Sequence, residues 1–339
     1  MIDQLLIRAD ANSEIGYGHA MRCLALAQAA HSQGTIIHFV FTDAPQSVID
    51  AYSELGTRFL KIEAPAYSDN DAQVVCNYAK SHSISWIVLD TYLAQPSYVH
   101  TLRTEDTNVL CFDDTGMPSS MAADVIVNQN ASAKPEWYED TASHTKTLLG
   151  STFTMLRSEF INPEYCEKKD TILITTGGTD ELNCSPRIVD TLLPLLPGSL
   201  DCTVIIGSAN PHAGLLHKMY DDQPKVKLVE NVVNMQPFFS SAQLVFTGAG
   251  SSVWECLHLG TPIITMVLAE NQRAIAEHLE MLQLSYNAGY VKSEEFLKAI
   301  SNHFRKFMSE PQKFAQNAVR GKSLIDGRGA FKILESMEQ

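Results

Sequence analysis

Basic residues are scarce in this chain. Its 339 residues include 25 Lys and Arg against 39 Asp and Glu, which gives a formal net charge of -14 at pH 7. A negative field of this size repels nucleic acid and anionic membrane surfaces, unless a local basic patch reverses it. We therefore expect no nucleic-acid partner.

Long apolar runs are also missing. No segment approaches the roughly 20 apolar residues that a membrane-spanning helix needs. The first residues also lack the basic region and apolar run of a secretory signal. We therefore expect no membrane insertion and a cytoplasmic protein.

Signatures of metal, disulfide and cofactor chemistry are absent too. The seven cysteines are widely spaced and never form a C-x-x-C pair, which argues against a disulfide framework or a zinc site. The sequence has no H-E-x-x-H or H-x-H pattern, no P-loop, no complete G-x-G-x-x-G and no G-x-S-x-G motif. We expect neither a metal nor a cofactor.

What the sequence does contain is an alternation of short apolar segments with helical ones. The strand-like segments are 5–7, 36–41, 58–62, 86–90, 109–113, 125–127, 171–176, 202–206, 226–229, 244–246 and 263–267. This alternation predicts doubly wound parallel sheets that bind ligands beyond the carboxyl ends of their strands. We predict an α/β protein of two Rossmann-like domains, 1–155 and 165–339, which face each other across a cleft in the GT-B architecture. The C-terminal helices could pack back on the first domain.

The loop after the first strand-like segment carries the strongest candidate for chemistry. Gly16 and Gly18 free the backbone, and His19 arrives where a helix should begin. The positive end of a helix dipole disfavours imidazolium, so His19 would be a neutral base able to deprotonate water or a sugar hydroxyl. The alternative is that His19 only packs or caps the helix.

A second glycine-rich loop follows the segment 244–246. Gly250, Ser251 and Ser252 precede a helix expected over 253–259, so their backbone N–H groups could hold a diphosphate. Glu255 falls in the first turn of that expected helix, where it could accept the hydroxyls of a ribose. The alternative is that these residues cap the helix and complement its dipole.

Other polar positions lie near expected strand ends or helix starts. Gly178 belongs to a turn after the segment 171–176, and Asn271 and Gln272 supply amide groups at a helix start, with capping as the alternative. Asp113 and Asp114 are adjacent, so on a strand they would point to opposite faces. We interpret these two carboxylates as loop-positioning and capping groups rather than an acid and base pair.

Motifs in both halves resemble, in the same order, those of a known family. They are RADANSEIGYGHAMRCL at 8–24, VLDTY at 88–92, DD at 113–114, VNQN at 127–130, LLGSTFTMLRSEF at 148–160, TGGTDELN at 176–183, TGAGSSVWEC at 247–256 and AENQ at 269–272. On these motifs the chain resembles the UDP-2,4-diacetamido-2,4,6-trideoxy-β-L-altropyranose hydrolases of pseudaminic acid synthesis and related spore coat polysaccharide proteins. The second half is also similar to the N-acetylglucosaminyltransferase of peptidoglycan synthesis.

The resemblance implies a metal-independent hydrolase that removes UDP from C1 of a di-N-acetylated deoxysugar by C–O cleavage with inversion. In this reading His19 matches the histidine that activates water. We assign to the UDP side Gly178, Gly250, Ser251, Ser252, Glu255, Asn271 and Gln272, and to the sugar side Asp10, Gly16, Gly18, Tyr92 and Asn130.

Two departures from the family pattern fall on the sugar side. The family commonly has D-H-Y where this chain has Asp90-Thr91-Tyr92, and D-Q-N where it has Asn128-Gln129-Asn130. A relative that acts on another nucleotide-activated amino sugar would keep the second half and vary here. The exact sugar is therefore left open, as are the oligomeric state and the glycan that receives the product.

Two other functions remain open at this point. A glycosyltransferase would use the same donor site with a sugar or lipid acceptor in place of water, although the acidic composition and the lack of a basic or apolar docking helix weigh against a lipid. A non-catalytic nucleotide-sugar binding protein would require that His19 be dispensable.

Overall fold

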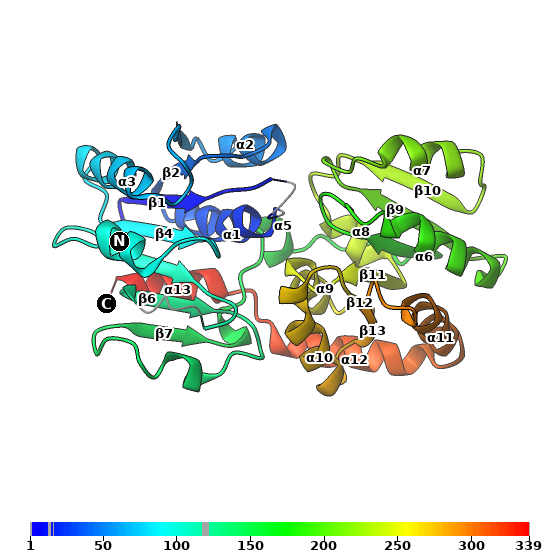
Figure 1. Ribbon diagram of the computed structural model, residues 1–339. Helices are drawn as coiled ribbons and strands as arrows, with labels where there is room; N and C mark the ends of the chain where they lie inside the picture. The colour runs from blue at the N-terminus through cyan, green and yellow to red at the C-terminus, as the bar shows by residue number, and fades with distance from the viewer. Residues whose placement is uncertain (1, 13–14, 16, 117–121, 339) are drawn as a thin grey trace. The chain divides into compact units, whose positions relative to one another are not determined.

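The computed structural model describes residues 2–12, 15, 17–116 and 122–338 (Figure 1). The chain forms two compact units, the first made of Met1–Ser158 and Gly327–Gln339 and the second of Glu159–Asp326. Each unit has its own parallel sheet with helices on both faces. This arrangement confirms the predicted α/β class with two Rossmann-like domains.

The first unit is built on a seven-stranded parallel sheet with the order β3-β2-β1-β4-β5-β6-β7. Its strands are β1 Gln4–Ala9, β2 Ile36–Phe41, β3 Arg58–Lys61, β4 Trp86–Asp90, β5 Asn108–Phe112, β6 Val125–Asn128 and β7 Lys146–Leu149. Its helices are α1 Gly18–Ser32, α2 Gln46–Ser53, α3 Asp69–Ser81, α4 Pro96–Leu102, η2 Pro135–Tyr138, η3 Ser151–Phe153 and α13 Gly329–Met337. The short helix α5 Ser158–Ile161 begins at the last residue of this part of the unit.

The central strand β1 shows why this sequence forms a covered parallel sheet. Leu5 and Ile7 pack into one apolar cluster with α1, while Leu6 between them packs into a second cluster with α3 and α4. Both faces of the strand are therefore buried, which explains its nearly continuous apolar sequence. Because the strand order reverses between β1 and β4, the carboxyl ends of these two strands form the place where such sheets bind ligands.

The second unit repeats this plan with six parallel strands in the order β10-β9-β8-β11-β12-β13. Its strands are β8 Thr171–Thr175, β9 Asp201–Ile206, β10 Val226–Glu230, β11 Leu244–Gly248, β12 Ile263–Val267 and β13 Tyr286–Tyr290. Its helices are α6 Cys184–Leu192, η4 Leu193–Leu195, α7 Ala213–Tyr220, α8 Gln236–Ser241, α9 Ser251–Leu259, η5 Glu270–Gln272, α10 Arg273–Met281, α11 Phe296–Ser309 and α12 Pro311–Leu324. Here the strand order reverses between β8 and β11.

The last helix, α13, belongs to the first unit, where it contacts α1 and η3, and Figure 1 draws it in red. Ile333 and Leu334 are buried in the same apolar cluster as α1. Gly329 allows the close approach at the start of α13, since a Cβ there would lie 2.1 Å from the carbonyl oxygen of Thr154. The sequence analysis counted this helix with the second domain and allowed it to pack on the first.

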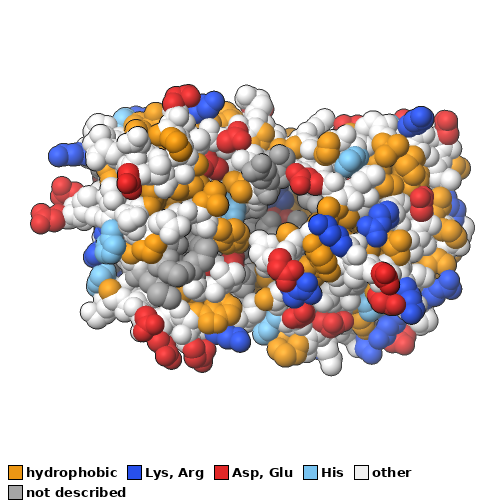
Figure 2. Space-filling view, viewed as in Figure 1, with side chains coloured by type: hydrophobic (Ala, Val, Ile, Leu, Met, Phe, Trp, Pro, Cys, Tyr) orange, Lys and Arg blue, Asp and Glu red, His pale blue; other side chains and the backbone are white. Residues whose placement is uncertain are grey.

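The surface of each unit mixes charges of both signs. Figure 2 shows acidic and basic side chains interspersed with hydrophobic ones over the viewed face. Among the helices of the described residues, none is long and apolar enough to cross a membrane.

Candidate active site

The first candidate site lies at the carboxyl ends of β1 and β4, where helix α1 begins. His19 is the second residue of α1, and the residue before the helix, Tyr17, makes no side-chain cap. His19 is only 8% exposed. The helix start thus fixes the backbone of His19 at the point where the strand order of the first unit reverses.

A buried carboxylate determines which nitrogen of His19 can react. His19 Nδ1 lies 2.5 Å from Asp90 Oδ1 at the end of β4. Because an ionised carboxylate only accepts hydrogen bonds, Nδ1 must carry a proton, so in the neutral imidazole Nε2 is the nitrogen with the lone pair. Nε2 makes no hydrogen bond within the described part of the chain. The pair therefore has the geometry of a general base held by an orienting carboxylate.

Arg22, one turn further along α1, keeps Asp90 ionised. Its Nε donates to Asp90 Oδ2 at 2.9 Å and its Nη2 to Oδ1 at 2.8 Å, while the Cys23 thiol lies 3.7 Å from Oδ2. Burial by itself would raise the pKa of Asp90, but Arg22 and then His19 oppose it and hold that pKa well below its ordinary value. The Asp90 carboxylate also offsets the helix dipole, because it stabilises the imidazolium that forms when Nε2 takes a proton.

A second carboxylate, Asp114, gathers three donors beside this pair. Arg22 Nη1 and Asn130 Nδ2 each donate to Asp114 Oδ1 at 2.7 Å, and the Tyr92 hydroxyl donates to Oδ2 at 2.6 Å. The Tyr92 ring also meets the His19 ring edge to face, with centroids 4.6 Å apart. The structure thus brings His19, Tyr92 and Asn130 together, and their catalytic and sugar-side roles stay predictions.

Asp113 and Asp114 have separate roles in this arrangement. Asp113 Oδ1 accepts the backbone N–H groups of Thr115 and Gly116 and so shapes the loop after β5. Asp114 instead joins the candidate site through Arg22, so interpreting both residues as loop groups was incomplete. The sequence analysis placed none of Arg22, Asp90 and Asp114 in the catalytic site. The available signal was that Asp90 ends β4 and Asp114 follows the neighbouring strand β5 by two residues.

The remaining sugar-side residues lie in different settings. Asp10 Oδ1 accepts the backbone N–H groups of Thr42 and Asp43, and it lies 3.0 Å from Arg8 Nη1. These bonds give Asp10 a clear part in holding two loops together, and its contact with a sugar stays a prediction. A Cβ on Gly18 would meet open space. Gly16 lies outside the described residues.

The second candidate site lies at the end of β11, where Gly248 and Gly250 lead into α9. The helix begins at Ser251 rather than at Val253, so Ser251 and Ser252 occupy its first turn. The expected place of Glu255 in the first turn was therefore wrong, because the earlier start moves it to the second turn. There its side chain is 4% exposed.

Gln272 lies against this glycine loop, whereas Asn271 is exposed in η5, just before α10. The Gln272 Oε1 atom accepts the backbone N–H of Leu268 at 3.0 Å. A Cβ on Gly248 would come within 2.6 Å of the Leu268 side chain and 3.3 Å of Gln272 Oε1. Absence of a side chain at Gly248 is what lets the β12–α10 connection approach the loop.

Gly178 lies in the loop after β8, the other strand at the reversal point of this sheet. A Cβ on Gly207 would lie 2.3 Å from the Gly178 carbonyl oxygen, and Ala209 donates its backbone N–H to the same oxygen at 3.1 Å. Asp180 accepts the first N–H groups of α6, at Cys184 and Ser185. Backbone contacts therefore fix this loop.

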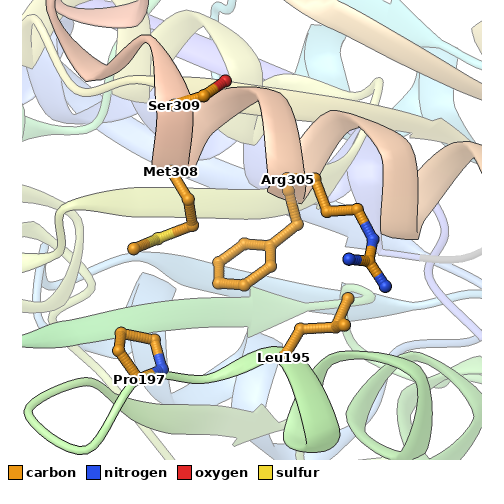
Figure 3. A pocket seen from close by; sticks show the side chains of 6 residues that line it. Leu195, Pro197, Arg305, Met308 and Ser309 are labelled. Atoms are coloured by element: carbon orange, nitrogen blue, oxygen red, sulfur yellow. The ribbon is translucent and has the colours of Figure 1, made fainter.

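A surface pocket of the second unit lies elsewhere, between the η4 region and α11 (Figure 3). Leu195, Pro197 and Met308 are among the residues that line it. None of the residues around it belongs to the sites predicted from the sequence.

The chain has the GT-B fold. It superposes on the crystal structure of MurG from Acinetobacter baumannii with a TM-score of 0.71 at 15% identity, covering 99% of each chain. Residues 171–326, which make up most of the second unit, match the glycosyltransferase family 28 C-terminal domain. The predicted GT-B architecture is thereby confirmed.

Three relatives narrow the comparison. The chain is 26% identical over 81% of its length to the UDP-2,4-diacetamido-2,4,6-trideoxy-beta-L-altropyranose hydrolase of Campylobacter jejuni, and the match spans 96% of that enzyme. It is 22% identical to the spore coat polysaccharide biosynthesis protein SpsG of Bacillus subtilis, over 96% of this chain and 95% of SpsG. An uncharacterized protein of Methanocaldococcus jannaschii is 26% identical over 80% of this chain, which spans 57% of that relative.

These matches confirm the resemblance drawn from the motifs. Together with the fold, they support an enzyme of nucleotide-sugar processing.

Proposed function

We propose that this protein hydrolyses a UDP-activated, di-N-acetylated deoxysugar at C1 and releases UDP and the free sugar for the synthesis of a pseudaminic-type acid. The observation that carries the proposal is the His19–Asp90 pair, a histidine with one nitrogen held by a buried carboxylate. The activity named for the Campylobacter jejuni relative supports the choice of reaction.

In the proposed reaction, His19 Nε2 takes a proton from a water molecule while the water oxygen attacks C1 of the sugar. The bond between C1 and the phosphate oxygen breaks, and its electron pair leaves with UDP. Attack opposite the leaving group inverts C1. The Asp90 carboxylate stabilises the imidazolium formed in this step, and UDP is a good enough leaving group that no second carboxylic acid is needed.

The UDP side of the proposal belongs to the second unit. The backbone N–H groups of Gly250, Ser251 and Ser252 would bind the diphosphate at the start of α9, and Glu255 would accept the ribose hydroxyls. Gly178, Asn271 and Gln272 would complete this side of the site.

The sugar side would be formed by Tyr92 and Asn130 beside His19, with Asp10 after β1 and Gly18 at the start of α1. Gly16, outside the described residues, is proposed for this side on the resemblance alone. Thr91 and Asn128 differ from the family pattern here, and both are buried. We propose a di-N-acetylated sugar because the resembling family acts on such a sugar, and not because of these two residues.

Hydrolysis in ¹⁸O-labelled water tests the reaction. A panel of UDP-amino sugars should release UDP with the label on the sugar, because water attacks carbon. Label on the phosphate would place the attack at phosphorus and contradict the proposal. The His19→Ala variant should lose turnover and still bind UDP, and a nearly normal rate in that variant would remove His19 as the base.

A glycosyltransferase is the second candidate, favoured by the match of residues 171–326 to a glycosyltransferase domain. It would use the same base to deprotonate an acceptor hydroxyl instead of water. Such an enzyme should release UDP slowly until a sugar or lipid acceptor is added, whereas the proposed hydrolase needs no acceptor.

A further inference from the structure

The side chain of Asn130 is almost fully buried and uses only one of its polar ends. It is 3% exposed, and its Nδ2 donates to Asp114 Oδ1 at 2.7 Å. Since a carboxylate can only accept, the amide nitrogen must face Asp114, which fixes the orientation of the amide. The other end, Asn130 Oδ1, accepts no hydrogen bond from any residue of the described ranges.

Asp114 imposes the same polarity on Tyr92. Its carboxylate accepts the phenolic proton of Tyr92 as well as the Asn130 amide, and Arg22 Nη1 supplies the third donor. Burial by itself would raise the pKa of Asp114, but the charge and hydrogen bond of Arg22 outweigh burial and lower that pKa below its ordinary value. The carboxylate is therefore an ionised acceptor. Asn130 and Tyr92 thus each turn a donor toward Asp114, and toward a ligand their oxygens can only accept.

The Asn130 Oδ1 atom is not among the fully buried side-chain atoms that lack a partner in the described ranges, so water can reach it in the free protein. A bound sugar that covers this oxygen would displace the water, and a sugar without a donor there would leave the acceptor unsatisfied. Building on the proposed function, we propose that Asp114 sets the hydrogen-bond polarity of the sugar side, and that Asn130 Oδ1 accepts the N–H of an acylamino group. The site would thereby select sugars with an amide at that position over those with an ester, a ketone or a carboxylate.

The chemistry of these groups explains the selection. An amide N–H is a fixed donor, because its nitrogen lone pair is delocalised and cannot accept. Ester, keto and carboxylate oxygens only accept, so they would oppose the lone pairs of Asn130 Oδ1 and leave a buried acceptor unsatisfied. A hydroxyl could still donate after rotation, and we expect it to bind between these extremes.

Binding in the absence of turnover tests the inference separately from the reaction. In the His19→Ala protein, calorimetry would give Kd values for UDP, for UDP-2,4-diacetamido-2,4,6-trideoxy-β-L-altropyranose, and for analogues with acetoxy in place of acetamido at C2 or at C4. We expect one acetoxy analogue to bind roughly 10- to 100-fold more weakly than the diacetamido sugar. The inference would be overturned if both acetoxy analogues bound as tightly as the diacetamido sugar, or if the diacetamido sugar bound no better than UDP.

Variants of the pair show whether Asp114 sets the polarity. In Asp114→Asn the amide of Asn130 can rotate by 180° and present its N–H₂ group to the sugar, because the new asparagine can donate as well as accept. The ratio of acetoxy to acetamido Kd should then fall to about one, while the Kd for UDP stays unchanged. The exchange variant Asp114→Asn with Asn130→Asp returns an acceptor to position 130 and should restore the ratio of acetoxy to acetamido Kd. This variant can be measured even where the single variant fails to fold. A ratio unchanged in Asp114→Asn, or not restored by the exchange, would leave Asp114 a purely structural role and overturn the inference. If the unmodified protein does not hydrolyse the UDP-sugar but the ratio of acetoxy to acetamido Kd is as expected, only the proposed reaction is contradicted.

Discussion

The two candidate sites occupy equivalent places in their sheets but are built from different materials. In the first unit, Asp90, Arg22 and Asp114 form a buried network of ion pairs, with side chains at most 11% exposed. In the second unit, the loops after β8 and β11 depend on glycines whose backbones approach other segments closely.

This difference fits the tasks proposed for the two units. A buried carboxylate with fixed donors assigns a proton to one nitrogen, which a general base requires. Backbone N–H groups bind an anion without changing their protonation, which suits a diphosphate. Removing the Asp90 charge should therefore mainly reduce the rate, and disturbing a glycine loop in the second unit should mainly reduce UDP binding.

Asp90→Asn should have the largest effect. An asparagine can donate to Nδ1, which would move the proton to Nε2 and remove the base, so we expect kcat to fall roughly 10³- to 10⁴-fold. Steady-state UDP release measures the rate, and calorimetry should show an unchanged Kd for UDP. A kcat within a few fold of the unmodified protein would mean that Asp90 does not set the tautomer.

Asp71→Asn is the matched control in the same unit. Asp71 is fully buried, and its carboxylate binds Arg8 at 2.6 Å and the Tyr98 hydroxyl. Within the described residues, none of its hydrogen bonds goes to His19 or Asp90. This variant should lose stability, because a buried ion pair is broken, but the folded fraction should keep a nearly normal kcat. Equal losses of kcat in both variants would attribute the effect of Asp90 to general disruption.

Gly207→Ala should disturb the second unit instead. The added Cβ would lie 2.3 Å from the Gly178 carbonyl oxygen, so the two loops must move apart, and we expect a loss of roughly 1–3 kcal/mol in the free energy of unfolding with weaker UDP binding. Gly214→Ala, where a Cβ meets open space in α7, should be neutral or slightly stabilising. Similar unfolding midpoints for the two variants in urea would contradict the close approach.

Acidification should affect buried and exposed histidines of the two units in opposite ways. Burial, followed by His82 and Arg58, lowers the pKa of His38 to about 4 from 6.5. Between these values the unfolded chain binds a proton that the folded one does not, so stability falls as pH falls, by up to about 1.4 kcal/mol per pH unit. His38→Gln should remove this dependence, as read from amide exchange in β2 between pH 6.5 and 4.5.

His217 in the second unit provides the contrast. The hydrogen bonds that its ring nitrogens donate to the Asp221 and Glu230 carboxylates raise the pKa of this exposed imidazole. Its contribution to stability is present at acidic pH and is lost as pH rises through the raised pKa. His217→Gln should therefore reduce stability at low pH, and the same sign of change in both histidine variants would show that the assigned environments are wrong.

Much of the fold could be predicted because buried parallel strands have a clear sequence pattern. The strands that the sequence analysis missed, β7 and β13, lie at the sheet edges. β7 is partly exposed, and β13 contains Gly289 and pairs irregularly with β12, so neither has the continuous apolar run of a central strand.

The candidate site was predictable only where a local motif marked it. His19 stood out because two glycines and a helix start surround it in sequence. Asp90, Arg22 and Asp114 come from separate segments, and their contacts span 68 and 92 residues along the chain. No spacing rule reports such contacts, because they depend on the order of the strands in the folded sheet.

The smallest effect that we expect is on the UDP side, at Glu255. If its carboxylate accepts both ribose hydroxyls, Glu255→Gln keeps one acceptor oxygen, replaces the other with an NH₂ donor and removes the negative charge. The Kd for UDP should then rise roughly tenfold, which corresponds to about 1.4 kcal/mol. Glu294→Gln, an exposed glutamate in the same unit, should leave the Kd unchanged. The ligand pair UDP and 2′,3′-dideoxy-UDP makes the test specific: the unmodified protein should prefer UDP, and Glu255→Gln should lose most of that preference. An unchanged preference would assign Glu255 to the packing of α9, and UDP recognition would then rest on the backbone alone.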